Sequence, residues 1–187
     1  VAGLVGYSLT GTRIENSYNA GNIYGGGSGG LGGYIAGDLM DDDNGHSLIE
    51  FSYNSGLISG ETNVGGLFST CKPCKLIQTA NEGTVIAEYG LGGLSAELTG
   101  DIYNSYNAGK IKAETEIGGL VGHANSVNIT NSFNTQEIPS GNYNNGGVIG
   151  DYEGYLVQNV TNSFFINADP ENNFQQTQVT AKDFADG

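Results

Sequence analysis

The sequence predicts an all-β protein, a right-handed parallel β-helix-like solenoid of about six coils. Three observations predict this fold: a two-part phrase recurs along the chain, its copies are spaced by about 26 to 33 residues, and short β-rich segments alternate with turns of glycine and asparagine. Repeats of this kind bury their apolar faces against their neighbours, so they stack around one continuous core. A four-stranded propeller blade takes about 40 residues, so these shorter units fit solenoid coils better. The pattern itself does not specify the handedness.

The repeated phrase joins a glycine–aliphatic segment to a later segment of serine, an aromatic residue and asparagine. Its clearest copy is Gly119-Leu120-Val121-Gly122 followed by Asn131-Ser132-Phe133-Asn134. The second copy is expected to begin near Gly32-Gly33-Tyr34, and the third departs most because Ala80 replaces the aromatic residue. The predicted repeats fill residues 1–174, with a C-terminal tail or cap at 175–187. The units are about 1–28, 29–63, 64–90, 91–116, 117–144 and 145–174.

Each unit has the pattern of short strands joined by turns. In the first unit, Ile14-Glu15-Asn16-Ser17-Tyr18 is β-rich and Asn22-Ile23-Tyr24 resumes a strand. Between them, Asn19-Ala20-Gly21 is a turn, because Asn and Gly adopt positive φ at low cost. Apolar residues are not sustained at spacings of three and four, so helices are not expected.

Stacked coils place equivalent residues in columns, and three columns are expected. A β-branched, inward-facing column comprises Ile14, Ile49, Ile77, Ile102, Ile129 and Val160. An aromatic column, interrupted at Ala80, comprises Tyr18, Tyr53, Tyr106, Phe133 and Phe164. A ladder of side-chain amides, about 4.8 Å apart and each bonded to the next, comprises Asn19, Asn54, Asn81, Asn107 and Asn134.

Composition narrows the classes of partner. The chain has 187 residues, 32 glycines and a formal net charge of −14, from six Lys and Arg against twenty Asp and Glu. Nucleic acids and anionic membrane surfaces need clustered basic charge, so neither is an expected partner. No apolar run approaches the length of a membrane span, so no membrane insertion is expected. The first residues already belong to a repeat, which predicts a processed product or a piece of a longer chain.

The recurring Gly-Gly-Leu-Val-Gly and Ile-x-Asn-Ser-Tyr-Asn-x-Gly phrases resemble the GLUG-motif repeat family. The likeness extends to about Phe165, which stands where the last copy should carry asparagine. The resemblance implies a bacterial cell-surface or secreted protein, since the family includes large adhesins and the non-catalytic repeat regions of IgA-specific metallopeptidases.

Cys71-Lys72-Pro73-Cys74 has the spacing of a thiol redox pair or of half a zinc site. Redox motifs of this type begin a helix, and a structural zinc needs two further ligands, for which only His46 and His123 are present, in other copies. The favoured interpretation is a local disulfide between Cys71 and Cys74 that fixes a protruding turn, as an extracellular setting would allow. Two free thiols are the alternative.

The segment 38–45 is the densest in acidic residues. Its carboxylates could surround Ca²⁺, with Asp41 and Asp43 as the candidate ligands, although the EF-hand pattern is not met. A solvated acidic loop is the favoured interpretation, and no other cofactor is expected.

No catalytic residues are predicted, and we expect no enzymatic activity. The HExxH motif is missing from the sequence, no GxSxG nucleophile elbow is expected, and Glu50, Asp101 and Asp151 fall at unrelated positions in the repeat. The expected function is a non-catalytic extracellular module of a bacterial surface or secreted protein, serving as an adhesive or structural stalk or as an assembly unit. Its expected partners are a host glycan or protein. The alternatives are an accessory repeat region of a secreted IgA-type metallopeptidase and a filament subunit that assembles with its own copies through the solenoid ends.

Overall fold

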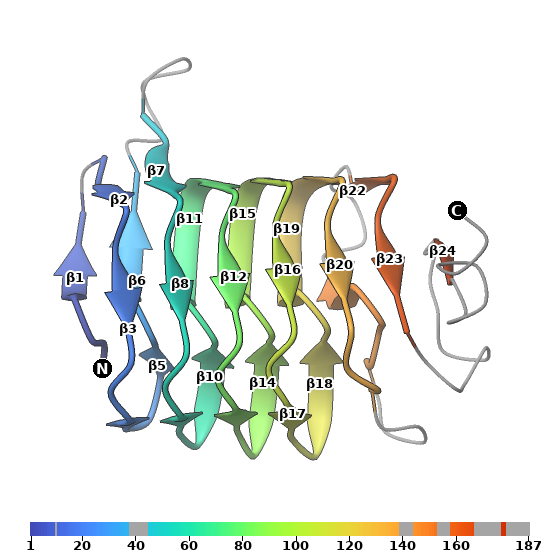
Figure 1. The fold of residues 1–187 in the computed structure, drawn as a ribbon, viewed down its shortest axis with the longest axis horizontal. Coiled ribbons are helices and arrows are strands. Elements are labelled where there is room, and N and C mark those ends of the chain that lie inside the picture. The colour runs from blue at the N-terminus through green and yellow to red at the C-terminus, as the bar shows by residue number, and fades with distance from the viewer. Residues whose placement is uncertain (10, 38–44, 139–143, 153–157, 167–176, 179–187) are drawn as a thin grey trace.

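The protein is a parallel β-solenoid of about five turns, all-β and without a helix in the described residues (Figure 1). This computed structural model describes residues 1–9, 11–37, 45–138, 144–152, 158–166 and 177–178. Within these ranges no helix is long and apolar enough to cross a membrane. Equivalent strands of successive turns pair in parallel, so main-chain hydrogen bonds run along the solenoid axis.

Four parallel sheets form the walls of the solenoid. Sheet 1 comprises β1 Val5–Ser8, β2 Arg13–Glu15, β6 Gly32–Ala36, β7 Ser47–Glu50, β11 Phe68–Ile77, β15 Ser95–Tyr103, β19 Val121–Thr130, β21 Ile149–Tyr152 and β22 Gln158–Thr161. Sheet 2 comprises β3 Tyr18–Asn19, β8 Tyr53–Asn54, β12 Ala80–Asn81, β16 Tyr106–Asn107, β20 Phe133–Asn134, β23 Phe164–Phe165 and β24 Thr177–Gln178. Sheet 3 comprises β4 Ile23–Tyr24, β9 Ile58–Ser59, β13 Val85–Ile86 and β17 Ile111–Lys112. Sheet 4 comprises β5 Ser28–Gly29, β10 Thr62–Gly65, β14 Tyr89–Gly92 and β18 Thr115–Gly118.

The corner between sheet 1 and sheet 2 is made by one residue with positive φ in every turn. Its φ lies between 47° and 52° in all six copies. Asparagine adopts this left-handed conformation more readily than other residues with a side chain, which explains why most copies carry it. The six residues are Asn16, Phe51, Gln78, Asn104, Asn131 and Asn162.

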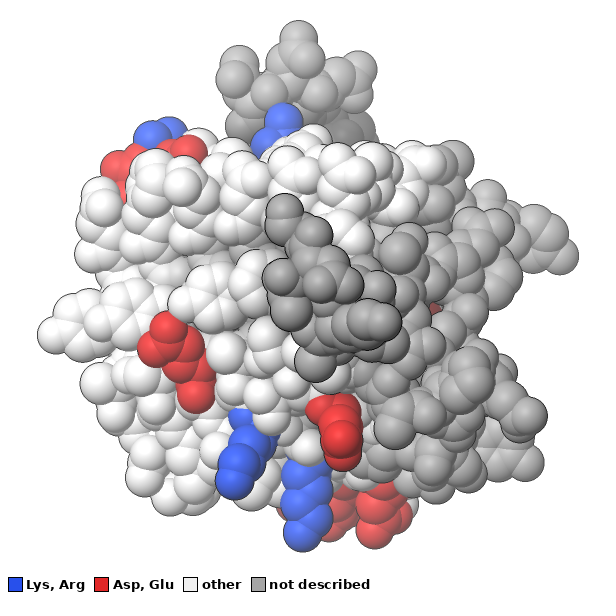
Figure 2. All heavy atoms as spheres, turned by 45° about the vertical axis from the view of Figure 1, so that its right-hand side comes forward, with Lys and Arg blue, Asp and Glu red and all other residues white. Residues whose placement is uncertain are grey.

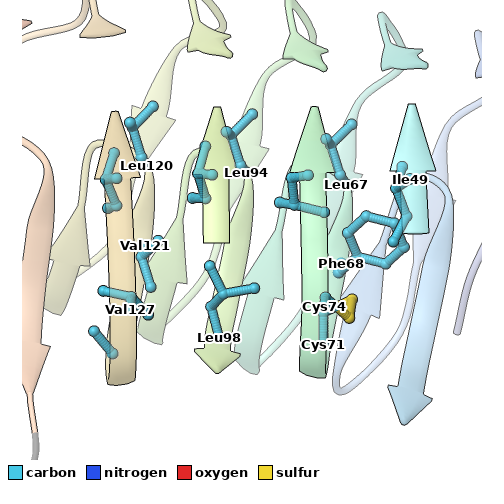
Figure 3. Packing of buried hydrophobic residues seen from close by; sticks show 14 of the residues in the cluster. Ile49, Leu67, Phe68, Cys71, Cys74, Leu94, Leu98, Leu120, Val121 and Val127 are labelled. Atoms are coloured by element: carbon cyan, nitrogen blue, oxygen red, sulfur yellow. A yellow bond between two sulfur atoms is a disulfide. The ribbon is translucent and has the colours of Figure 1, made fainter. Parts of the chain in front are cut away.

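The interior is filled by columns of apolar side chains. Figure 3 shows Leu67, Leu94 and Leu120 in one row, each from the short segment that precedes a strand of sheet 1. Leu31 and Val148 extend this row, and all five side chains are fully buried. Full burial of one such side chain is worth about 1.5–3 kcal/mol, so the columns are a main source of stability.

Glycine is required where this leucine row approaches sheet 2. A Cβ atom on Gly93 would lie 2.0 Å from the carbonyl oxygen of Gly119 and 2.7 Å from Cγ of Asn107. Real Cβ atoms do not come this close to backbone, so a side chain at this position would force successive turns apart. The Gly-Gly-Leu part of the repeat is therefore explained by close packing between turns.

Three details of the sequence interpretation are wrong. The coil count is about five rather than six, because β21 to β24 extend only sheets 1 and 2. The second copy of the phrase is Gly29-Gly30-Leu31 rather than Gly32-Gly33-Tyr34, since the Leu31 amide donates to the Leu67 carbonyl at 2.9 Å.

The third correction concerns the β-branched column. Leu76, and not Ile77, pairs with Ile49 and Ile102 and is fully buried. Strand residues alternate between the two faces, so the inward residue lies two positions before the corner residue Gln78. Ile77 therefore points outward. The other members occupy the column as predicted.

Candidate binding site on the aromatic face

The aromatic column lies on the outer face of sheet 2, along the row β3–β8–β12–β16–β20–β23 in Figure 1. The rings of Tyr18 and Tyr53 stack with centroids 5.3 Å apart, and those of Tyr106 and Phe133 stack at 5.2 Å. Both pairs are close to parallel, at interplanar angles of 10° and 7°. Tyr18 is 58% exposed and Tyr53 is 40% exposed, so this column offers aromatic surface to solvent.

The column is interrupted at Ala80, as the sequence predicts. Ala80 pairs with Tyr53 on one side and with Tyr106 on the other, so one ring is missing between two stacked pairs. A hollow of about 360 Å³ lies at this place, within the usual range for ligand sites of roughly 300–1,000 Å³. We call this hollow the ring slot. Its lining residues are Phe51, Ser52, Tyr53, Gln78, Ala80, Glu82 and Tyr106.

A buried amide ladder fixes the strands that carry the ring slot. Each asparagine Nδ2 donates to the Oδ1 of the next, at 2.7, 2.8, 2.8 and 2.9 Å, which confirms the predicted ladder of Asn19, Asn54, Asn81, Asn107 and Asn134. The same Nδ2 atoms also donate to the backbone carbonyl two residues further on. Buried polar networks of this kind rigidify the structure when their groups are satisfied. The ladder stops after Asn134, because the fully buried ring of Phe165 occupies the next position.

Glu82 supplies the charge of the ring slot. The equivalent position carries Ala20, Ser55, Ala108, Thr135 and Ile166 in the other copies, so Glu82 is its only charged member. The hydroxyl of Tyr106 donates to Glu82 Oε1 at 2.7 Å. This hydrogen bond, followed by partial burial and the nearby carboxylate charge, raises the pKa of Tyr106 above 10.0.

Two further lining residues depart from the repeat. Phe51 and Gln78 hold the left-handed corner position, at φ of 48° and 51°, where the other turns have asparagine. This conformation is unusual for a bulky residue and carries an energetic cost. Phe51 is 51% exposed, so only part of its surface is buried in this position. The departures from the repeat at Phe51, Gln78, Ala80 and Glu82 thus converge on one place.

The remaining predicted sites lie elsewhere. Cys71 and Cys74 form a disulfide, but both are fully buried in the core and belong to β11 rather than to a protruding turn (Figure 3). A bulge explains their position: Cys71 pairs with Leu98 and Cys74 with Gly100, so two residues of β11 oppose one of β15.

Metal-binding groups are not brought together in the described residues. No group of three or more His, Cys, Asp or Glu side chains there could hold a metal ion, and Asp41 and Asp43 lie outside the described residues. His123 Nδ1 lies 3.3 Å from Asp151 Oδ2. On the face seen in Figure 2, charged side chains stand in small separate groups among uncharged residues.

Reasoning from the sequence identified the gap at Ala80 but missed Phe51, Gln78 and Glu82 as its neighbours. A signal for them was available, since each is the unusual member of its column. Comparison with protein-family models, with curated proteins and with solved structures yields no match to this chain.

Proposed function

We propose that this chain is a non-catalytic extracellular repeat module of a bacterial surface or secreted protein, which serves as a stalk and as an adhesive surface. The observation that supports this most is the exposed aromatic column, held on a strand row that the buried asparagine ladder fixes. Tyrosine rings combine apolar area with a hydroxyl that can hydrogen-bond, so an exposed row of them suits contact with a host protein or glycan.

The disulfide supports the extracellular part of the proposal. Disulfides persist in oxidising compartments and are rare in the cytosol. Cys71 and Cys74 are bonded to each other and no cysteine is left free. The resemblance to GLUG-motif repeats points in the same direction, and membership of that family is part of the proposal.

The test uses the native chain in its own host. An antibody should find the protein at the cell surface or in the medium, and in the denatured protein Cys71 and Cys74 should be protected from alkylation until a reductant is added. Purified protein should be retained on host cells or matrix, and replacing both Tyr18 and Tyr53 by serine should reduce this retention. A cytosolic protein with two free thiols would contradict the proposal.

A second candidate function is end-to-end assembly with another copy of the chain. The first turn carries exposed apolar side chains at Leu4, Tyr7 and Leu9, with Tyr7 64% exposed. Among the described residues β1 is the outermost strand of sheet 1, and an edge strand with apolar neighbours can pair with another chain. Light scattering that shows only monomers at high concentration would remove this candidate. The IgA-type alternative requires an HExxH segment in the gene that encodes the chain.

A further inference from the structure

The geometry of the ring slot points to a specific occupant: we propose that it binds the guanidinium group of an arginine side chain on a partner protein. This inference rests on the proposed function as a binding module and adds the chemistry of the partner.

The shape of the slot selects a flat group. Tyr53 and Tyr106 occupy the levels directly before and after Ala80, and each stacks on its outer side against another ring. A group at the level of Ala80 is therefore one strand spacing, about 4.8 Å, from the level of each tyrosine. A cation is attracted to an aromatic face within about 6 Å of the ring centroid, so both rings can contribute.

The charge of the slot selects a cation. Glu82 is the only charged residue among the lining residues. One of its oxygens accepts the Tyr106 hydroxyl, and a carboxylate has about four lone-pair sites, so acceptor capacity remains for a ligand. The chain as a whole carries twenty acidic against six basic residues, which favours the approach of a basic partner.

Shape and charge together favour guanidinium over the other groups that could enter. Guanidinium is planar, stacks on aromatic faces and pairs with a carboxylate through two parallel hydrogen bonds. A lysine ammonium has the charge but is compact and strongly hydrated, and it cannot stack. A neutral aromatic ring can stack but has no charge to pair with Glu82, and a sugar ring can offer Glu82 hydroxyl donors but no opposite charge. The anionic slot disfavours phosphate and carboxylate ligands.

The test is a titration of ¹⁵N-labelled protein followed by amide chemical shifts, with N-acetylarginine amide as the probe. The matched probes are N-acetylcitrulline amide, which has nearly the same shape but no charge, and N-acetyllysine amide. We expect shifts centred on residues 78–82 with Tyr53 and Tyr106, and an affinity for the arginine probe about tenfold above that for either other probe, a difference of about 1.4 kcal/mol.

Three variants locate the effect. Glu82→Gln should lower the affinity for the arginine probe to that for citrulline, and Ala80→Phe should abolish binding because its ring fills the slot. Glu88→Gln removes an exposed carboxylate from the same turn, outside the slot, and should change nothing. Dispersed amide spectra show that each variant is folded.

The proposal is overturned if citrulline or lysine binds as well as arginine, if the shifts spread over the acidic surface, or if Ala80→Phe still binds. The proposal is also overturned if none of the three probes binds. In that case the proposed function still stands if the protein is extracellular and adheres through its other tyrosines. A cytosolic location would remove the proposed function whatever the titration shows.

Discussion

Filling the gap in the aromatic column should stabilise the protein. Ala80→Phe places a ring between Tyr53 and Tyr106, where two stacked contacts at the spacing of the existing pairs, 5.2–5.3 Å, become available. The hollow at this position shows that the ring has room.

The size of the effect follows from two opposing contributions. Each aromatic pair is worth about 0.5–1.5 kcal/mol, so two pairs give about 1–3 kcal/mol. Ordering a new side chain on a partly exposed surface costs about 0.5–1 kcal/mol. The net gain in the free energy of unfolding should be about 1 kcal/mol, which for a chain of this size corresponds to a rise in Tm of about 2–4 °C.

Urea unfolding and calorimetry measure this gain, with Ala80→Leu as the control that adds apolar bulk without an aromatic face. A double-mutant cycle with Tyr106→Leu should assign part of the gain to stacking, since residues in contact are not additive. A Tm of Ala80→Phe at or below that of the native protein would refute the reasoning. It would show that the third turn has adapted to alanine.

Three further predictions test other parts of the structure. Asn81→Ala removes a central rung of the amide ladder and leaves its buried neighbours unsatisfied, so it should lower the free energy of unfolding, measured in urea, by about 2–4 kcal/mol. Asn19→Ala removes the rung at the end of the ladder and should cost less. Equal losses for the two variants would contradict a continuous ladder. Gly93→Ala should prevent folding or lower Tm strongly, because its Cβ would lie 2.0 Å from the carbonyl oxygen of Gly119. Gly6→Ala is the control with a smaller expected effect, because a Cβ at Gly6 meets nothing within 4 Å. Similar Tm values for the two variants would show that the turns can separate. Because the pKa of Tyr106 is raised, its contribution to stability is complete below pH 10 and is lost as pH rises through the higher folded-state value. Urea midpoints measured from pH 8 to 11 should therefore fall less steeply for Tyr106→Phe, and unchanged steepness would argue against the hydrogen bond.

The parts of the fold that depend on spacing could be predicted from the sequence. The asparagine ladder and the aromatic column both follow from one short phrase of the repeat. Its aromatic residue and its asparagine, which are Tyr106 and Asn107 in one copy, each pair with the equivalent residue of the turn before and the turn after. The prediction of Ile77 as an inward residue is wrong because Leu76, although not β-branched, lies at the fixed distance of two residues from the corner at Gln78.

Other features depend on three-dimensional packing. The sequence predicts the disulfide between Cys71 and Cys74, but it does not predict the bulge in β11 or the burial of both residues in the core. The ring slot combines Phe51 and Ser52 with Glu82 and Tyr106, which belong to three different turns. A single sequence shows which of these residues are unusual in their columns. That these residues lie next to one another can be known only from the register in which successive turns pair.

The ladder also has a mechanical consequence. Its rungs are separated by 27, 26 and 27 residues from Asn54 to Asn134, and the side-chain hydrogen bonds that a rung makes to other turns go to the rungs beside it. A force applied to the two ends of the chain would therefore peel off one turn after another. Each released turn adds about 90 Å of extended chain, at about 3.3–3.6 Å per residue. Such a rod would lengthen in steps and dissipate load before a tethered contact breaks.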